Sequence, residues 1–93
     1  MALLSDEDVT NRLADVPEWH RDGDEIARDL SFADFAEAIG FVDRVAAVAE
    51  AENHHPDILV HGWNKVRLTL STHSQGGLTE ADFVLAAQID RLA

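Results

Sequence analysis

The sequence contains no cysteine at any of its 93 positions. This absence excludes a disulfide framework, a thiolate nucleophile and any zinc site built on cysteine ligands. Long apolar runs are also missing, since no stretch approaches the roughly 20 apolar residues that span a bilayer. The first eight residues, MALLSDED, lack the basic region of a signal peptide. We therefore expect an intracellular protein of the cytoplasm.

Basic side chains are scarce. Seven Lys and Arg residues stand against 18 Asp and Glu residues, for a formal net charge of -11. Such a surface repels a phosphate backbone, so nucleic-acid binding is not expected. The acidic excess is typical either of a salt-rich cytoplasm or of an ordinary acidic protein kept soluble by its charge. The salt-rich interpretation predicts that unfolding moves to higher denaturant as KCl is added.

Residues 1–93 are expected to form a single domain with one modest core, because a chain of this length buries only about two-thirds of its unfolded surface. Apolar residues spaced three and four apart predict helices, and strict alternation predicts strands. Helices are predicted at residues 5–16, 33–52 and 79–92, and strands at 19–21, 24–32, 58–61 and 65–73. This αββαββα order predicts an α+β fold, with a four-stranded, mainly antiparallel sheet and three helices packed on one face.

Turn and cap residues mark several boundaries. Ser5 and Thr79 are candidate N-caps, and Pro17 ends the first helix. Asp22-Gly23 predicts a tight hairpin turn, because glycine accepts the positive φ of such a turn. We expect Gly62 and its neighbours to connect the last two strands.

Apolar spacing also assigns faces. In the second strand, Ile26 and Leu30 share a face if Arg28 keeps its stem on that face and its charged head in solvent. The long helix carries a main apolar stripe, which Ala38, Phe41, Val45 and Val48 widen: Phe35, Ile39, Val42, Ala46 and Ala49. So broad a stripe predicts burial by the sheet and by another subunit. Gly40 marks either close approach by a neighbouring element or a tolerated imperfection.

Four of the five histidines fall within a twenty-residue window: His54, His55, His61 and His73. His20 and His61 are interpreted as ordinary surface residues. His54 and His55 are adjacent and precede Pro56, which restricts the backbone where a turn would orient both rings. Titratable groups that cluster in this way are typical of functional sites.

Imidazole and carboxylate groups suggest two kinds of chemistry. A metal site is the less favoured, because His54-His55 is not the i, i+4 pair of a helical metal site and no HExxH motif is present. General acid and base catalysis fits better, since histidines can both donate and accept protons near neutral pH. That chemistry needs no cofactor and no metal, and we expect neither.

A spaced motif then resembles a known family. Its parts are Glu50-x-x-x-His54-His55-Pro56, Trp63-Asn64-Lys65-Val66, Thr69-Leu70-Ser71-Thr72-His73, Gly77-Leu78-Thr79 and Asp82. This combination resembles pterin-4a-carbinolamine dehydratase, the small enzyme also described as a dimerisation cofactor of a homeodomain transcription factor. The resemblance covers nearly the whole chain.

The resemblance implies the αββαββα fold and a homodimer or homotetramer. It also implies a reaction, the loss of water from 4a-hydroxytetrahydropterin to give quinonoid dihydropterin. This reaction serves the recycling of tetrahydrobiopterin after an aromatic amino-acid hydroxylase has turned over.

The same resemblance implies roles for individual residues. By position, His54 and His73 match the acid and base groups, and His55 matches the residue that binds and orients the pterin. Glu50 would hold an imidazole or a pterin nitrogen. The other expected pterin contacts are Asn53, Pro56, Ser71 and Thr72. We expect the three imidazoles to line one concave, pterin-sized pocket.

One departure from the family pattern concerns the segment before Trp63. Six residues, 57–62, separate Pro56 from Trp63, where the pattern has five. The extra residue predicts a bulge or a longer turn at His61-Gly62. Two other functional hypotheses stay open, a non-enzymatic dimerisation or regulatory interaction module and a divalent-metal protein.

Overall fold

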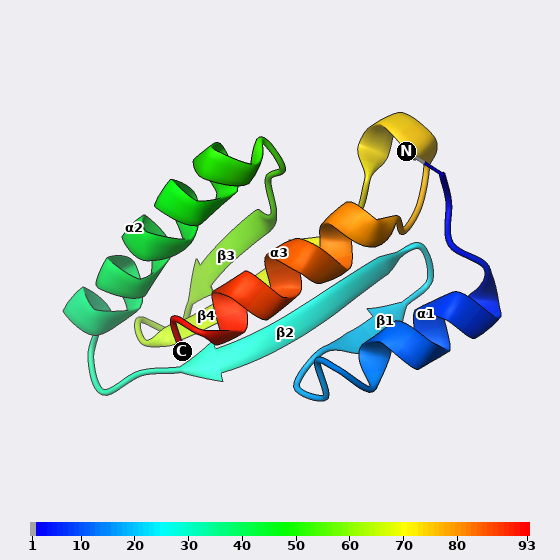
Figure 1. Cartoon of the computed structure of the whole chain (residues 1–93). Coiled ribbons are helices and arrows are strands. Elements are labelled where there is room, and N and C mark those ends of the chain that lie inside the picture. The colour runs from blue at the N-terminus through cyan, green and yellow to red at the C-terminus, as the bar shows by residue number, and fades with distance from the viewer. Residues whose placement is uncertain (1) are drawn as a thin grey trace.

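Three helices cover one face of a four-stranded antiparallel sheet, whose strand order is β1-β2-β4-β3 (Figure 1). The computed structural model describes residues 2–93. Along the chain lie α1 (Asp6–Leu13), β1 (His20–Asp22), β2 (Glu25–Ser31), α2 (Phe35–Glu52), β3 (Asp57–His61), β4 (Lys65–Leu70), the short 3-10 helix η1 (His73–Gln75) and α3 (Glu80–Asp90). The predicted αββαββα order is confirmed. No helix within residues 2–93 is both long and apolar enough to cross a membrane.

Two hairpins build the sheet, and their inner strands β2 and β4 pair with each other. Asp22 pairs with Glu25, so the first turn consists of Gly23 and Asp24, one residue later than predicted. In the second hairpin, residues 62–64 form a three-residue turn. The β3–β4 register runs unbroken up to this turn. A longer turn, rather than a bulge, therefore accommodates the segment before Trp63.

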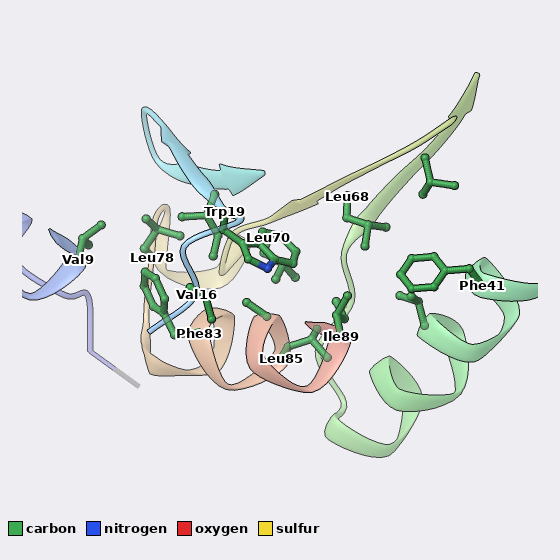
Figure 2. Packing of buried hydrophobic residues seen from close by; sticks show 14 of the residues in the cluster. Val9, Val16, Trp19, Phe41, Leu68, Leu70, Leu78, Phe83, Leu85 and Ile89 are labelled. Carbon is green, nitrogen blue, oxygen red and sulfur yellow. The ribbon is translucent and has the colours of Figure 1, made fainter. Parts of the chain in front are cut away.

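The core lies between the helices and the inner face of the sheet (Figure 2). Alternate residues of β4 face it as predicted, because Val66, Leu68 and Leu70 are fully buried. Burying a side chain of this size stabilises the fold by about 1.5–3 kcal/mol. Residues from every helix and from β2 complete the core: Val9, Ile26, Phe41, Val45, Phe83, Leu85 and Ile89.

Arg28 differs from its predicted state. Its head is not in solvent, because Nη1 lies 2.5 Å from Asp90 Oδ1 and only 16% of the side chain is exposed. The indole Nε1 of Trp19 donates to the same carboxylate oxygen at 2.8 Å. Asp90 belongs to α3, so this network fastens the end of α3 to β2. A buried guanidinium needs such a partner to offset its lost hydration.

The long helix α2 buries a different stripe from the one predicted. The side chain of Asp34 caps its start by accepting from the Glu37 amide at 2.8 Å. The residues that face the core are Ala38, Phe41, Val45 and Ala49, whereas Phe35 is 54% exposed. Helical spacing indicated a broad apolar surface, but the approach of α2 to the sheet decides which part is covered. A Cβ at Gly40 would meet only the tip of Arg44, so no close approach explains this glycine.

Candidate active site

The strand register brings the two halves of the motif to the same end of the sheet. Asp57 at the start of β3 pairs with Thr69 near the end of β4. Continuing that antiparallel register past the strand ends sets His54 opposite Thr72. The segment after α2 and the segment after β4 therefore meet.

The end of α2 determines how the two histidines leave the helix. Asn53 adopts the left-handed conformation, with φ 51° and ψ 40°. Its amide donates to the Glu50 carbonyl, and the His54 amide donates to the Ala49 carbonyl. These two bonds form a Schellman motif, a common way to end a helix. The turn that aims the histidines is thus made at Asn53, before them, rather than at Pro56 as predicted.

His54 and His55 have different partners and different exposure after this turn. The imidazole of His54 is directed inward, where Nε2 lies 2.6 Å from Asp82 Oδ1 of α3 and the side chain is only 16% exposed. The imidazole of His55 is 55% exposed and pairs through Nε2 with Glu50, one turn back on α2. The prediction that Glu50 holds an imidazole agrees with this contact.

Asp82 is the centre of a buried polar cluster. Its side chain is fully buried, and Oδ2 accepts from the hydroxyl of Thr72 and from the backbone amide of Thr79, each at 2.9 Å. The two threonine hydroxyls lie 2.7 Å apart. A buried carboxylate is tolerated only when donors surround it, and this one is surrounded by donors from three segments.

The motif contains Asp82 but does not indicate its role. One local signal was available, since Thr79-x-x-Asp82 has the spacing of a capping box, and the structure shows that box at the start of α3. The contact with His54 spans 28 positions and has no local signal.

His73 lies beyond β4, not at its end as predicted. The strand stops at Leu70, and His73 begins η1, where its side chain is exposed. Within the described residues its imidazole has no hydrogen-bonding partner. Ser71 is half-buried, and Thr72 is buried with its hydroxyl donating to Asp82. The sheet therefore carries the chain only as far as Leu70, and the short helix η1 determines where His73 lies.

The expected concave pocket is not confirmed. Two clefts in the chain, of about 460 Å³ and 200 Å³, lie elsewhere, one beside the first turns of α2 and the other between α1 and α3. None of the three histidines lines either cleft. Among residues 2–93, no three His, Asp or Glu side chains are arranged to hold a metal ion. His20 and His61 are exposed and stand outside the site, as predicted.

The arrangement can move protons. Because Asp82 lies against Nε2 of His54, that nitrogen carries the hydrogen and Nδ1 is left for a ligand. Neutral His54 then offers a lone pair at Nδ1, and charged His54 offers a proton there. The carboxylate also fixes the plane of the ring, in the way an aspartate orients a catalytic histidine elsewhere.

Comparison with known proteins identifies the family. The sequence profile described as pterin 4 alpha carbinolamine dehydratase matches residues 2–92. A protein of Nocardia farcinica, provisionally named a pterin-4-alpha-carbinolamine dehydratase, is 55% identical over 91 residues, which are 98% of this chain and 95% of that protein. A protein of Roseiflexus castenholzii with the same provisional name is 52% identical over 91 residues, 98% of this chain and 97% of that one.

Solved structures agree with this result. The crystal structure of a transcriptional coactivator/pterin dehydratase from Brucella melitensis matches with a TM-score of 0.93 and 32% identity, over 99% of both chains. A pterin dehydratase-like protein identified as a RuBisCO assembly factor in the alpha-carboxysome matches with a TM-score of 0.70 and 30% identity, over 82% of this chain and 89% of that one. With fold, motif and sequence in agreement, this chain belongs to the pterin 4 alpha carbinolamine dehydratase family of lyases.

Proposed function

We propose that this protein removes water from 4a-hydroxytetrahydropterin and releases quinonoid dihydropterin for tetrahydrobiopterin recycling in the cytoplasm. The observation that carries the proposal is the contact between His54 and the buried Asp82, since it orients an imidazole at the point where the two motif segments meet. Membership of the family supports the same reaction.

The proposed chemistry is a balanced elimination. An imidazolium protonates the 4a-hydroxyl, the C4a–O bond breaks and water departs. A neutral imidazole or solvent removes the proton from N5, and the N5–C4a double bond forms. His54 and His73 supply the acid and base groups, and each such group typically contributes a factor of about 10² to 10⁴.

In this proposal, the remaining motif residues either bind the pterin or support the residues that do. His55 orients the pterin, and its pairing with Glu50 supports that role by restricting the ring at the exposed edge of the site. Ser71 and Pro56 flank the pterin. The structural contacts favour support rather than binding for two residues, since Asn53 makes the turn and Thr72 donates to Asp82.

Self-association is part of the same proposal, as a homodimer or homotetramer. Phe35 on α2 and Leu59 on the edge strand β3 are each 54% exposed. Apolar side chains of this size on a helix face and on an unpaired sheet edge favour contact with another copy.

The direct test supplies enzymatically generated 4a-hydroxytetrahydropterin and follows formation of the quinonoid product. We expect clear acceleration over buffer. No acceleration, with protein in excess of substrate, would contradict the proposal. Sedimentation of the same samples reports the oligomeric state.

Histidine variants test the roles. His54→Ala and His73→Ala should each lower kcat by at least about tenfold, while His55→Ala should mainly raise KM. His20→Ala is the matched control, because this exposed histidine of β1 lies outside the site and should leave both constants unchanged. Full activity of both the His54 and His73 variants would refute the acid and base assignment.

A second candidate function is a non-enzymatic interaction module. The names of two structural relatives, one a coactivator and one a RuBisCO assembly factor, favour its consideration. The histidine variants distinguish the two functions, because a module that acts only through its surface would keep its full function in His54→Ala and His73→Ala.

A further inference from the structure

The segment that carries His73 is a compact loop closed at its base. The Thr72 amide donates to the Gly77 carbonyl at 2.8 Å, and the amides of Gln75 and Gly76 both donate to the Thr72 carbonyl at 3.0 Å. We call residues 72–77 the His73 loop. These hydrogen bonds lie within the loop. Its position relative to the rest of the protein therefore depends on the contacts made at its base.

The base of the loop contacts two other parts of the protein, the candidate site and the start of the chain. On the site side, the Thr72 hydroxyl donates to Asp82, which also contacts His54. At the start of the chain, the contact is made by Leu3 and Leu4, which we call the N-terminal strap. The Leu4 amide donates to the Leu78 carbonyl at 2.9 Å, directly after the loop.

Leu3 lies against the glycine at position 77. A Cβ placed on Gly77 would lie 3.1 Å from Leu3 Cδ2, closer than carbon atoms normally approach. The leucine side chain therefore rests directly on the Gly77 backbone. Gly77 itself is buried, although the leucine above it remains 52% exposed.

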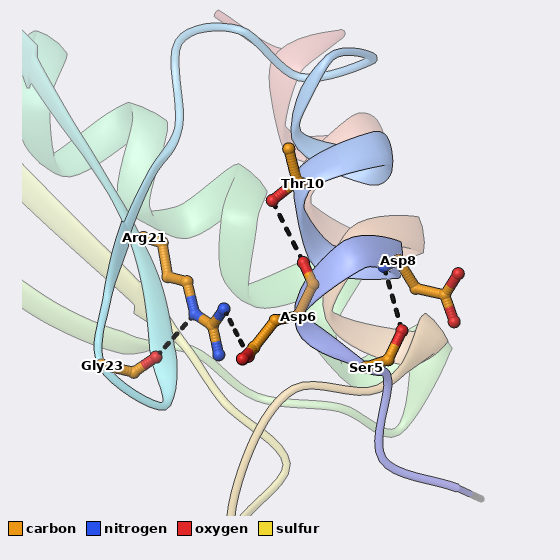
Figure 3. A network of polar contacts seen from close by, with 6 residues as sticks. All are labelled: Ser5, Asp6, Asp8, Thr10, Arg21 and Gly23. Carbon is orange, nitrogen blue, oxygen red and sulfur yellow. Dashed lines mark hydrogen bonds and ion pairs between the residues drawn. The ribbon is translucent and has the colours of Figure 1, made fainter.

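The strap is anchored at its other end by α1. The Ser5 hydroxyl accepts from the Asp8 amide at 3.1 Å, and Arg21 Nη1 donates to Asp6 at 2.9 Å (Figure 3). In α1, Val9 is 1% exposed and belongs to the core, and the partly buried Leu13 packs against it. The strap thus runs between a capped, docked helix and the His73 loop.

We infer that the N-terminal strap is a positioning element of the active site, in which Leu3 presses on Gly77 and thereby sets where the His73 loop stands relative to His54. The inference rests on the proposed function for its kinetic consequence. Catalytic groups displaced by about 1 Å can cost up to about a hundredfold in rate, so a half-exposed leucine outside the site can matter for turnover.

A double-mutant cycle on Leu3 and Gly77 tests the contact. Leu3→Ala should lower kcat at least about threefold with KM changed less than about twofold, because binding groups stay in place. Gly77→Ala should lower kcat as well, since its new Cβ pushes against Leu3. The double variant should lose less than the product of the two losses, because removal of the leucine makes room for the Cβ.

Val84→Ala is the matched control. Val84 is 46% exposed and lines the cleft between α1 and α3, to which no residue of the His73 loop contributes. It should leave kcat unchanged. Strict multiplicativity in the cycle, or equal losses from Leu3→Ala and Val84→Ala, would overturn the inference.

A readout without substrate separates this inference from the proposed function. Leu3→Ala should speed hydrogen exchange at the Gly77 amide and shift the imidazole NMR signals of His73, while those of His20 stay in place. If neither loop signal changes, the inference is wrong whatever happens to kcat. If the loop signals change but the unaltered protein shows no dehydratase activity, the proposed function fails and the role of the strap in placing the loop stands.

Discussion

At the scale of single residues, the contact between His54 and Asp82 matters most. The carboxylate is fully buried and accepts from Thr72 and Thr79 as well, so it cannot turn away from the imidazole without losing partners. Such a fixed acceptor selects one tautomer of His54, with hydrogen on Nε2. In the proposed mechanism, this carboxylate acts on the reaction through the histidine.

Asp82→Asn tests the tautomer directly. The side-chain amide can donate to Nε2 of His54, which would move the ring hydrogen to Nδ1 and block the nitrogen left for the substrate. We expect kcat to fall by about 10² or more with little change in KM, measured in the steady state. Imidazole ¹⁵N shifts of His54 should report the changed tautomer. An unchanged kcat together with a changed tautomer would show that His54 is not an acid or base.

At the scale of elements, the end of α2 decides the direction of both histidines. A left-handed residue is needed at position 53 to close the helix and send His54 toward α3. Asparagine occupies this conformation more easily than most residues, and glycine more easily still.

Substitution at this turn predicts a stability difference. Asn53→Ala should lower the free energy of unfolding by about 1 kcal/mol, because a Cβ without a compensating polar group is strained at positive φ. Asn53→Gly should change it by no more than a few tenths of a kcal/mol. Urea unfolding measures both. Asn11→Ala, at an exposed position in the regular helix α1, is the control and should stay within about 0.5 kcal/mol of the parent. Equal losses for Asn53→Ala and Asn53→Gly would contradict this account.

At the scale of the whole molecule, charge is the dominant feature. The formal net charge of -11 means that folding brings many like charges together. Within residues 2–93, four arginines form ion pairs with carboxylates: Arg12, Arg21, Arg28 and Arg67. The pairs made by Arg12, Arg21 and Arg67 are exposed and contribute at most about 1 kcal/mol each, so most of the acidic surface remains unbalanced.

The salt dependence of unfolding follows from this charge. At pH 7 the denaturation midpoint should rise as KCl is added from low to molar concentration, because salt screens repulsion within about 3 Å at 1 M. At the sequence pI of about 4.5 the net charge is near zero, so the same addition of KCl should raise the midpoint less. Urea is the suitable denaturant, since it adds no ions. A midpoint that stays flat at pH 7 would favour the ordinary acidic protein over the salt-adapted one.

Local patterns in the sequence determined the order of elements, the caps at Ser5 and Thr79, the buried face of β4 and the grouping of the histidines. Each depends on neighbours a few positions apart, through backbone propensity, side-chain alternation and helix capping. The tertiary structure alone decided which stripe of α2 is buried, that β4 stops before His73, and that Arg28 and His54 each find a carboxylate on α3. These contacts join residues 62 and 28 positions apart. They arise only when packing brings distant segments together, because burying a polar group requires a partner that no local pattern specifies.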